Sequence, residues 1–329
     1  MDSPSAHAGA LVPYENTGSL PVLYSLAGEA RRFASAARSR ATRRAYACDW
    51  NDFVAWCDRQ AVAPLPADPA VIALYLTDLA KRAKVATIER RLVAIRHAHK
   101  AAGHASPTVD ITICDVMAGI RRELGTAQNR KAALEVCDLR LIIDAIPDNL
   151  KGWRDRALLL LGFAGALRRS ELVALTVRDV QLVREGLEIK IAHSKTDQEG
   201  AGETIGVLYG SNPATCPVRT LQTWLERATI VEGPLFRQVD RHGRLGSAAL
   251  TGDSVARIVQ RHIRTLPGRD ASRYGGHSLR AGFATSAAAN GASERSIMAQ
   301  TRHKSVAIAR RYVRHGSMWR EHAGAVLGL

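Results

Sequence analysis

Side chains suited to phosphate chemistry occur at intervals through the second half of the chain. Arginine carries a planar guanidinium that donates two parallel hydrogen bonds to phosphate oxygens. A tyrosine phenol can attack phosphorus as a nucleophile when a neighbouring group takes its proton. An Arg, a Lys, a His-x-x-Arg pair, a further His and a Tyr follow one another as Arg168, Lys195, His277, Arg280, His303 and Tyr312. The sequence therefore contains groups that could bind and attack a phosphate.

Each of these residues also has an ordinary structural explanation. Arg168 lies in an Arg-Arg-Ser-Glu run after a very apolar segment, where cations at a helix C-terminus would complement the macrodipole. Lys195 could be a solvated loop lysine, and Tyr312 could be an amphipathic tyrosine at a helix surface. His277 and Arg280 lie one helical turn apart and follow two glycines, so backbone can approach an anion there. Taken singly, the signals are weak.

The elements that must position these residues are predicted to be helices around one small sheet. Alternating apolar residues predict strands at 187–192 and 203–208, paired as a hairpin with Lys195 at its tip. Apolar periodicity predicts helices at 138–145, 154–164, 216–228, 254–264, 277–290, 293–301 and 306–313. We therefore expect a mainly α chain with a small antiparallel β-sheet, in which an α+β domain covers residues 132–329.

The first half of the chain has no strand pattern and predicts an all-helical domain over residues 21–124. Its four predicted helices carry apolar stripes at helical spacing: Tyr46, Trp50, Phe53 and Cys57; Ile72, Tyr75, Leu76 and Leu79; Ile88, Leu92 and Ile95; Ile113, Val116, Met117, Ile120 and Leu124. Asp68 and Pro69 predict the N-cap and first position of the second helix. The polar segment 125–131 predicts a linker, and residues 1–20 a flexible tail.

The net charge indicates the class of partner. The 329 residues include 46 Lys and Arg against 31 Asp and Glu, which gives a formal charge of +15. A chain that is 46% hydrophobic can bury a core, so this charge belongs to a folded protein and is typical of nucleic-acid binding. The rival interpretation of a basic surface is a membrane face. No apolar run of about 18 residues predicts a membrane span.

Cofactor-dependent chemistry has no sequence support. The five cysteines include no CxxC pair, no HExxH motif occurs, and His97 and His99 fall on different faces of a predicted helix. No GxxxxGK[ST] loop predicts the use of ATP. We therefore expect no metal and no cofactor, and the scattered cysteines predict a reduced, cytoplasmic protein.

The full set of motifs resembles the tyrosine recombinase (phage integrase) family, in particular its Cre-like two-domain branch. That family has an Arg followed three residues later by Glu, as in GALRRSEL, then a hairpin Lys, a His-x-x-Arg motif, a Gly-His or Trp position, and a Tyr nine residues later. Arg302 replaces the glycine that usually precedes His303. The segments WCDRQAVAPLPADPAVIALYL and TIERRLVAIRHAH resemble the core-binding domain, so the resemblance covers nearly the whole chain.

The resemblance implies a role for each matched residue. Tyr312 would attack the scissile phosphate of duplex DNA and form a 3′-phosphotyrosine, which conserves the bond energy for rejoining. His277 would assist proton transfer from Tyr312, and Lys195 would protonate the leaving 5′ oxygen as general acid. Phosphate contacts are assigned to Arg168, Arg280 and His303, and orientation of the basic cluster to Glu171.

The resemblance also implies a function and partners. Duplex DNA would be cut, exchanged between paired sites and rejoined. The partners would be double-stranded DNA with inverted-repeat half-sites and further copies of the chain, as a dimer on each site and a tetramer in the synapse. DNA contacts are predicted for Arg43, Arg44, Arg90, Arg91 and Lys304. The stretch Ser317–Leu329 has apolar residues at helical spacing and predicts a helix that docks on a neighbouring copy or packs on its own domain.

Two other functions remain open on the sequence. A type IB topoisomerase-like enzyme would nick and close DNA with the same cluster, as a monomer. A non-catalytic DNA-binding protein would retain only the fold. In each case the expected location is the cytoplasm, on the DNA of a bacterium, phage or plasmid.

Overall fold

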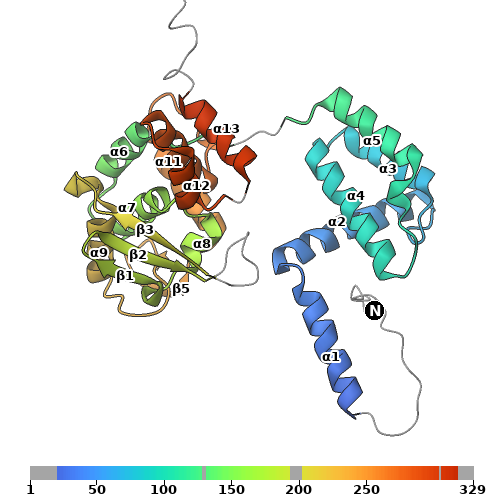
Figure 1. Ribbon diagram of the computed structural model, residues 1–329, viewed down its shortest axis with the longest axis horizontal. Coiled ribbons are helices and arrows are strands. Elements are labelled where there is room, and N and C mark those ends of the chain that lie inside the picture. The colour runs from blue at the N-terminus through green and yellow to red at the C-terminus, as the bar shows by residue number, and fades with distance from the viewer. Residues whose placement is uncertain (1–20, 128–130, 193–201, 304, 318–329) are drawn as a thin grey trace, which may run out of the picture. The chain divides into compact units, whose positions relative to one another are not determined.

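The computed structural model describes residues 21–127, 131–192, 202–303 and 305–317. The chain divides into two compact units, residues 1–129 and 130–329 (Figure 1). This division lies inside the predicted linker 125–131, and the predicted domain bounds stay a prediction. The predicted tail at 1–20 and residues 318–329 of the predicted docking helix lie outside the described residues.

The first unit is helical over its described residues. Its elements are α1 (Pro21–Ala36), α2 (Arg40–Gln60), α3 (Pro69–Ala80), α4 (Val85–Ala101), the short 3-10 turn η1 (Pro107–Val109) and α5 (Ile111–Leu124). α3 begins as predicted, because Asp68 Oδ1 accepts a hydrogen bond from the Ala70 amide at 2.7 Å and Pro69 takes the first helical position. The predicted stripes meet in one core, whose fully buried members include Phe53, Ile72, Tyr75, Leu76, Leu79, Ile88, Ile95 and Ile113.

Two features of the first unit differ from the prediction. α1 is an additional helix that the sequence did not signal by a core stripe, and its Tyr24 and Phe33 side chains are exposed. Leu124 was expected in the core but is 48% exposed. Leu124 is the last residue of α5, one turn beyond Ile120, which is still buried. The apolar stripe therefore runs past the point where α5 leaves its neighbours.

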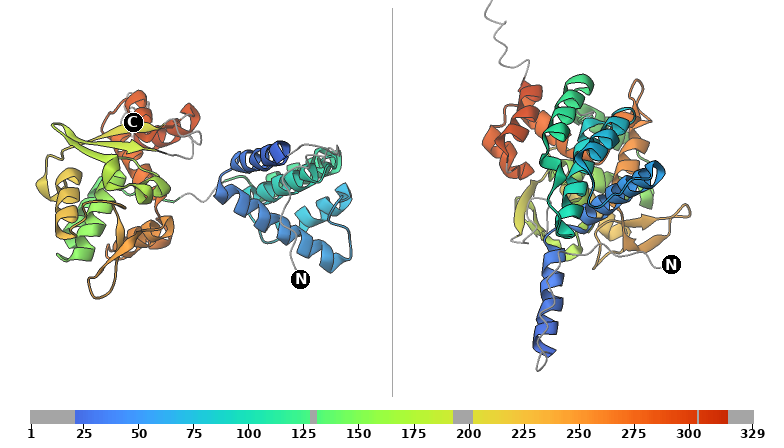
Figure 2. Two further views of the ribbon diagram at one scale, coloured as in Figure 1. Left: turned by 90° about the horizontal axis from the view of Figure 1, so that it is seen from below. Right: turned by 90° about the vertical axis from the view of Figure 1, so that its right-hand side faces the viewer.

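The second unit combines helices with two small antiparallel sheets (Figure 2). Its helices are α6 (Val136–Ala145), α7 (Leu150–Ala164), α8 (Arg169–Ala174), α9 (Pro217–Arg227), α10 (Gly252–Ile263), α11 (His277–Ala289), α12 (Glu294–Thr301) and α13 (Val306–Ser317). One sheet has the strand order β1 (Val180–Val183), β2 (Gly186–Ile191) and β3 (Glu203–Leu208), and the other pairs β4 (Arg237–Val239) with β5 (Leu245–Ala249). The predicted fold class, mainly α with a small antiparallel sheet, is confirmed.

The predicted hairpin is the β2–β3 pair. Ile189 lies opposite Ile205, and Ile191 lies opposite Glu203. Ile189 and Ile191 face the core, whereas Lys190 between them is exposed, which is the alternation that the sequence showed. β1 and the β4–β5 pair were not predicted, because they are short and their burial does not alternate regularly.

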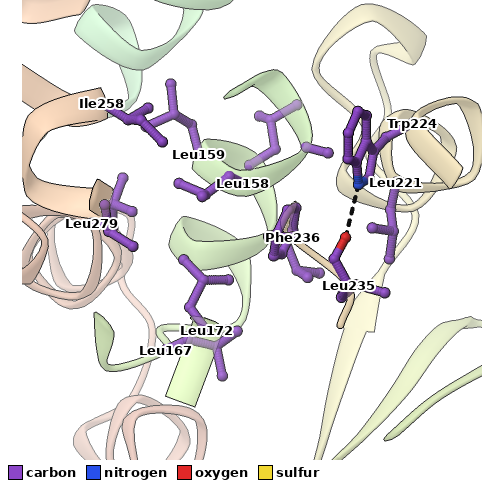
Figure 3. Close-up of a cluster of buried hydrophobic side chains, with 14 of the residues drawn as sticks. Leu158, Leu159, Leu167, Leu172, Leu221, Trp224, Leu235, Phe236, Ile258 and Leu279 are labelled. Carbon is purple, nitrogen blue, oxygen red and sulfur yellow. Dashed lines mark hydrogen bonds between the residues drawn. The ribbon is translucent and has the colours of Figure 1, made fainter. Parts of the chain in front are cut away.

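α7 lies at the centre of the core of the second unit. The consecutive residues 157–161 of α7 are all buried, as expected of an unbroken apolar run. Figure 3 shows Leu158 and Leu159 among side chains that come from several other elements of the unit. The Trp224 indole N–H donates to the Leu235 carbonyl at 2.9 Å, so its polar atom is satisfied inside the core. This packing fixes the C-terminal end of α7, where the candidate site begins.

α11, α12 and α13 form a smaller cluster of helices, which Figure 1 shows together. A Cβ atom at Gly316 of α13 would lie 2.3 Å from the Thr285 carbonyl oxygen of α11. Glycine is therefore required for α13 to approach α11 this closely. Ala284 and Ala288 of α11 form the small buried seam against which Tyr312 packs. Among the described helices, none has the length and apolarity that crossing a bilayer requires.

Candidate active site

The turn between α7 and α8 places Arg168. α7 ends at Ala164, and Arg168 is the N-cap residue of α8. Ala166, inside this turn, has a left-handed φ of 45° and is fully buried. The helix-C-terminus explanation of Arg168 is therefore wrong, since the residue begins a helix instead of ending one. The turn carries the guanidinium away from the apolar core of α7.

Glu171 is a buried carboxylate shared by two guanidiniums. Arg168 Nη1 donates to Oε1 at 2.5 Å, and Arg302 Nη2 donates to Oε2 at 2.5 Å. The Arg168 amide donates to Oε2 at 2.9 Å. Burial by itself would raise the pKa of Glu171, but the Arg302 and Arg168 cations and the amide outweigh it and lower that pKa. An ionised Glu171 thus fixes Arg168 from two sides, as the predicted orienting role requires.

Arg280 presents unpartnered donors inside the protein. It lies on the first turn of α11, and its residue is 1% exposed. Nη1 donates to the Ala166 carbonyl at 2.8 Å, while Nε and Nη2 are buried without a hydrogen-bond partner among the described residues. Burial, with repulsion from Arg168 and Arg302, lowers the pKa of Arg280 to about 9, so it stays protonated at neutral pH. Buried donors of this kind are costly unless a ligand satisfies them.

His277 and Tyr312 are brought together by α11 and α13. Their Nε2 and Oη atoms are 2.7 Å apart. In the tautomer protonated at Nδ1, His277 Nε2 accepts the phenol hydrogen, which is the geometry that proton transfer needs. Gly316, four residues after Tyr312, allows the close approach of α13 to α11. The Tyr312 side chain is half-buried, so its hydroxyl can be reached by a large substrate.

His303 stacks on the nucleophile candidate. Its ring lies 5.8 Å from the Tyr312 ring between centroids, at an interplanar angle of 13°. Nδ1 is 2.8 Å from Thr301 Oγ1, whose hydroxyl donates to the Ile297 carbonyl at 2.7 Å. The hydroxyl hydrogen is thereby used, so Nδ1 of His303 carries the hydrogen of that contact. Burial, with the nearby Arg280 and Arg168 cations, lowers the pKa of His303 to about 4.

Arg302 is the residue of this cluster that the sequence did not assign to the site. It is 7% exposed and has a left-handed φ of 54°. Besides Glu171, its side chain contacts the Gln300 carbonyl at 3.3 Å, and its Nε lies 3.5 Å from Glu203 Oε2. Its own carbonyl accepts from Arg168 Nη2 at 3.3 Å. The available signal was its departure from the glycine that the family usually has before His303.

The structure brings together Arg168, Glu171, His277, Arg280, His303 and Tyr312. Lys195, within residues 193–201, and Lys304 lie outside the described residues, as do residues 318–329. The proposed roles of Lys195 and Lys304 therefore stay predictions.

The arginines predicted to contact DNA in the first unit have different surroundings. Arg43 and Arg44 are exposed in the first turns of α2. Arg90 Nε and Nη2 donate to the two oxygens of buried Asp49 at 2.7 and 2.9 Å. Arg91 is hydrogen-bonded to Asp52 and, at 2.9 Å, to Tyr75 Oη. Contact of these residues with DNA stays a prediction.

The assembled cluster is suited to a phosphate under nucleophilic attack. The cluster contains three guanidiniums, and Glu171 accepts hydrogen bonds from two of them. A second carboxylate, Glu203, lies at longer range from Arg302. This leaves positive charge and the free Arg280 donors next to Tyr312, which would stabilise the negative charge that develops on phosphate oxygens. A phenol with an imidazole at hydrogen-bond distance can act as the nucleophile.

Known proteins are similar to this chain in sequence. The sequence profile of the phage integrase family matches residues 133–317. The integrase/recombinase xerD homolog of Selenomonas ruminantium is 42% identical over 299 residues, which cover 90% of this chain and 87% of the relative. Recombinase cre of Escherichia phage P1 is 25% identical over 284 residues, which cover 80% of both chains.

Solved structures have the same fold at lower sequence identity. The XerH site-specific recombinase in a post-cleavage complex with palindromic difH substrate aligns with a TM-score of 0.61 and 18% identity, over 79% of this chain and 72% of that chain. A lambda integrase dimer bound to a COC′ core site aligns with a TM-score of 0.57 and 18% identity, over 89% and 95%.

The fold is that of the tyrosine recombinases. The profile match and the 42% identity show that the chain belongs to the phage integrase family. The resemblance predicted from the spaced motifs is thereby confirmed.

Proposed function

We propose that this chain is a site-specific recombinase that cuts and rejoins duplex DNA through a 3′-phosphotyrosine at Tyr312. The observation that carries the proposal is the pairing of Tyr312 Oη with His277 Nε2 at 2.7 Å. Beside it lies Arg280, whose buried Nε and Nη2 have no hydrogen-bond partner within the part of the chain that the structure describes. A nucleophile with an adjacent proton acceptor and unpaired buried cationic donors are the parts that phosphoryl transfer requires. Membership of the phage integrase family supports the same reaction.

The reaction follows from the positions of these groups. The Tyr312 oxygen attacks phosphorus and forms a P–O bond, while the phenol proton passes to His277. Arg168 and Arg280 match the charge on the non-bridging oxygens. The P–O bond to the 5′ oxygen breaks, and that oxygen takes a proton from the general acid, for which Lys195 is the proposed residue. Attack by a free 5′ hydroxyl reverses these steps and rejoins the strand without a further energy source.

The first unit is proposed to hold the duplex. Arg40, Arg43 and Arg44 lie at the N-terminal end of α2, where the helix macrodipole already favours an anion. Cations are unfavourable there unless a phosphate is bound, so their presence supports DNA contact. Arg43 and Arg44 make no side-chain hydrogen bond or ion pair with other described residues, so they are available to a duplex.

Assembly on DNA is the finer part of the proposal. We infer inverted-repeat half-sites, with two copies of the chain per site and four in the synapse, and docking of the Ser317–Leu329 segment on a neighbouring copy. The lambda integrase dimer on its core site supports the dimeric arrangement. The place of action would be the cytoplasm, on DNA of the host, a phage or a plasmid.

The test is a covalent-adduct assay on a suicide duplex. Inverted repeats in the DNA flanking the gene supply the half-sites, and a nick beside the scissile phosphate prevents rejoining. We expect a denaturation-resistant adduct on the 3′ phosphate and a gel-shifted complex that pairs two duplexes. Binding without an adduct would indicate a non-catalytic DNA-binding protein. An adduct with relaxation of supercoils but no pairing would indicate a nicking-closing enzyme.

A further inference from the structure

Arg302 combines two unusual properties. Its backbone is in the left-handed region, with φ at 54°, which glycine adopts freely and other residues rarely do. Its guanidinium is almost fully buried. A side chain that is both buried and charged, on a backbone that disfavours any side chain, is retained only where its contacts compensate. The function of Arg302 must therefore lie in what its guanidinium contacts.

The contacts of Arg302 converge on Arg168. Its Nη2 donates a hydrogen bond to Oε2 of Glu171 at 2.5 Å. The other oxygen of that carboxylate, Oε1, accepts from Arg168 Nη1. The Arg302 carbonyl oxygen accepts from Arg168 Nη2 at 3.3 Å. Two nitrogens of the Arg168 guanidinium are thus held by groups that belong to Arg302 or are held by it.

The remaining contacts explain how Arg302 itself is fixed. Nη1 donates to the Gln300 carbonyl at 3.3 Å, within the same helix end. Nε faces Glu203 at the start of β3, at 3.5 Å and without hydrogen-bond geometry. Two nitrogens of the guanidinium are therefore hydrogen-bonded and the third faces a carboxylate at ion-pair distance, an arrangement that the single ammonium of lysine cannot reproduce.

We propose that Arg302 is a positioning residue for strand cleavage, which acts through Glu171 to aim the Arg168 guanidinium at one non-bridging oxygen of the scissile phosphate. The inference rests on the proposed function. It predicts that losing the Arg302 side chain misaligns Arg168 and leaves Tyr312 and its His277 partner in place. The cleavage rate should then fall, but only on substrates that retain the non-bridging oxygen that Arg168 contacts.

The experiment compares Arg302→Gly with the unaltered chain in single-turnover cleavage. Glycine is compatible with the backbone at this position and keeps the carbonyl that Arg168 contacts. The substrates are a suicide duplex with an ordinary phosphodiester and two duplexes with Rp or Sp methylphosphonate at the scissile position. Each methylphosphonate replaces one non-bridging oxygen by an uncharged methyl. Arg168→Ala serves as the reference for the isomer that lacks the oxygen of Arg168.

We expect Arg302→Gly to slow cleavage of the phosphodiester by about 10- to 100-fold, the range seen when outer partners of site ligands are removed. One methylphosphonate isomer should be cleaved by Arg168→Ala as fast as by the unaltered chain. On that isomer, the cleavage rate of Arg302→Gly should be within about twofold of the rate of the unaltered chain. Arg302→Lys keeps the charge but not the fork, and should give an intermediate loss with the same isomer pattern. The matched control is Arg227→Gly, at the end of α9. It removes an equal charge and an ion pair with Asp148, and it should change none of the cleavage rates.

Equal losses on all three substrates would overturn the proposal, because they would indicate general damage to the fold. No loss for Arg302→Gly would overturn it as well. Failure of the proposed function is distinguishable, since the unaltered chain would then form no adduct on any of the three substrates. If Arg302→Gly proves unstable, Arg302→Lys alone decides by its isomer pattern.

Discussion

Arginine clusters in the two units follow opposite rules of charge balance. In the first unit, Arg90 and Arg91 of α4 meet Asp49 and Asp52 of α2, so each cation has a carboxylate. In the second unit, three guanidiniums gather around a single carboxylate that bonds directly, Glu171. Arg280 has no carboxylate within ion-pair distance among the described residues.

The difference shows how to separate structural from functional arginines. A guanidinium paired with a carboxylate at a helix–helix contact has its charge balanced and adds to stability. A buried guanidinium with no carboxylate at ion-pair distance costs stability, so it is retained where an anion will arrive. By this criterion, we expect Arg280 to bind an anion and Arg91 to be chiefly structural.

Removal of the Tyr312 hydroxyl should have the largest effect. Tyr312→Phe keeps the ring that packs on Ala284 and Ala288 and stacks on His303, and loses the atom next to His277 Nε2. We expect no covalent adduct on a suicide duplex and nearly unchanged DNA affinity. An adduct formed by this variant would mean that another residue is the nucleophile.

Replacement of Arg280 by lysine should come next. The variant keeps a cation but loses the planar fork, so one ammonium would have to serve both the Ala166 carbonyl and the phosphate, without the two parallel donors that arginine presents. Loss of one donor to a developing anion typically costs about 10²–10³ in rate, and we expect a fall of that order in single-turnover cleavage. Cleavage near the normal rate would place Arg280 among the structural arginines, and the contrast between the units would fail.

Arg91→Leu should act on stability and spare affinity. It removes hydrogen bonds to Asp52 and Tyr75 and leaves a partly buried carboxylate without its cation. Hydrogen bonds to charged groups contribute about 1.5–3 kcal/mol, so the free energy of unfolding should fall by a similar amount. Denaturant titration of the full chain measures it. Unchanged stability with weakened DNA binding would instead support the predicted role of Arg91 as a DNA contact.

Neutralising Arg43 or Arg44 should weaken DNA binding and leave stability unchanged. Each is exposed and has no carboxylate partner among the described residues, so Arg43→Ala or Arg44→Ala should leave unfolding unchanged. Loss of one phosphate contact reduces the slope of log affinity against log salt concentration by about 1. DNA titrations at several salt concentrations check this, and an unchanged slope would remove these residues from the DNA-binding surface.

The smallest effect should come from His303. Its pKa is lowered to about 4 in the folded chain, first by burial and then by Arg280 and Arg168, against an ordinary value of about 6.5. Between these values the unfolded chain binds more protons, so stability is lost as the pH falls through this window. His303→Gln should flatten that dependence in thermal melts recorded from pH 4 to 7. An identical slope in the variant would show that His303 is not the group responsible.

Local patterns predicted those parts of the molecule that depend on neighbours in sequence. The stripe around Ile72 and Leu76 and the alternation of Ile189 and Ile191 are periodic, and they fold as the period requires. The site residues were recognised by the order of several motifs. Their juxtaposition was not visible, because it depends on the left-handed turn at Ala166 for Arg168 and on the packing of α13 against α11 for Tyr312.

Other features depend on contacts that the sequence does not reveal. Asp49 and Arg90 lie on different helices, so no local pattern joins them, and an arginine expected to face DNA has an internal partner. β4 and β5 are too short to show alternation. Arg302 follows neither period nor motif. Its importance comes from Glu171, far away in the chain and adjacent only in the fold.

The presence of Arg302 predicts a pattern of residue exchange among related sequences. Glycine and arginine codons differ by one nucleotide, so the backbone before His303 can exchange these residues in a single step. The new guanidinium would then meet Glu203 as well as Glu171. Residues in contact change together in descent. Among relatives, we expect arginine at this position to co-occur with an acidic residue at the start of the strand equivalent to β3, and glycine to occur without that restriction.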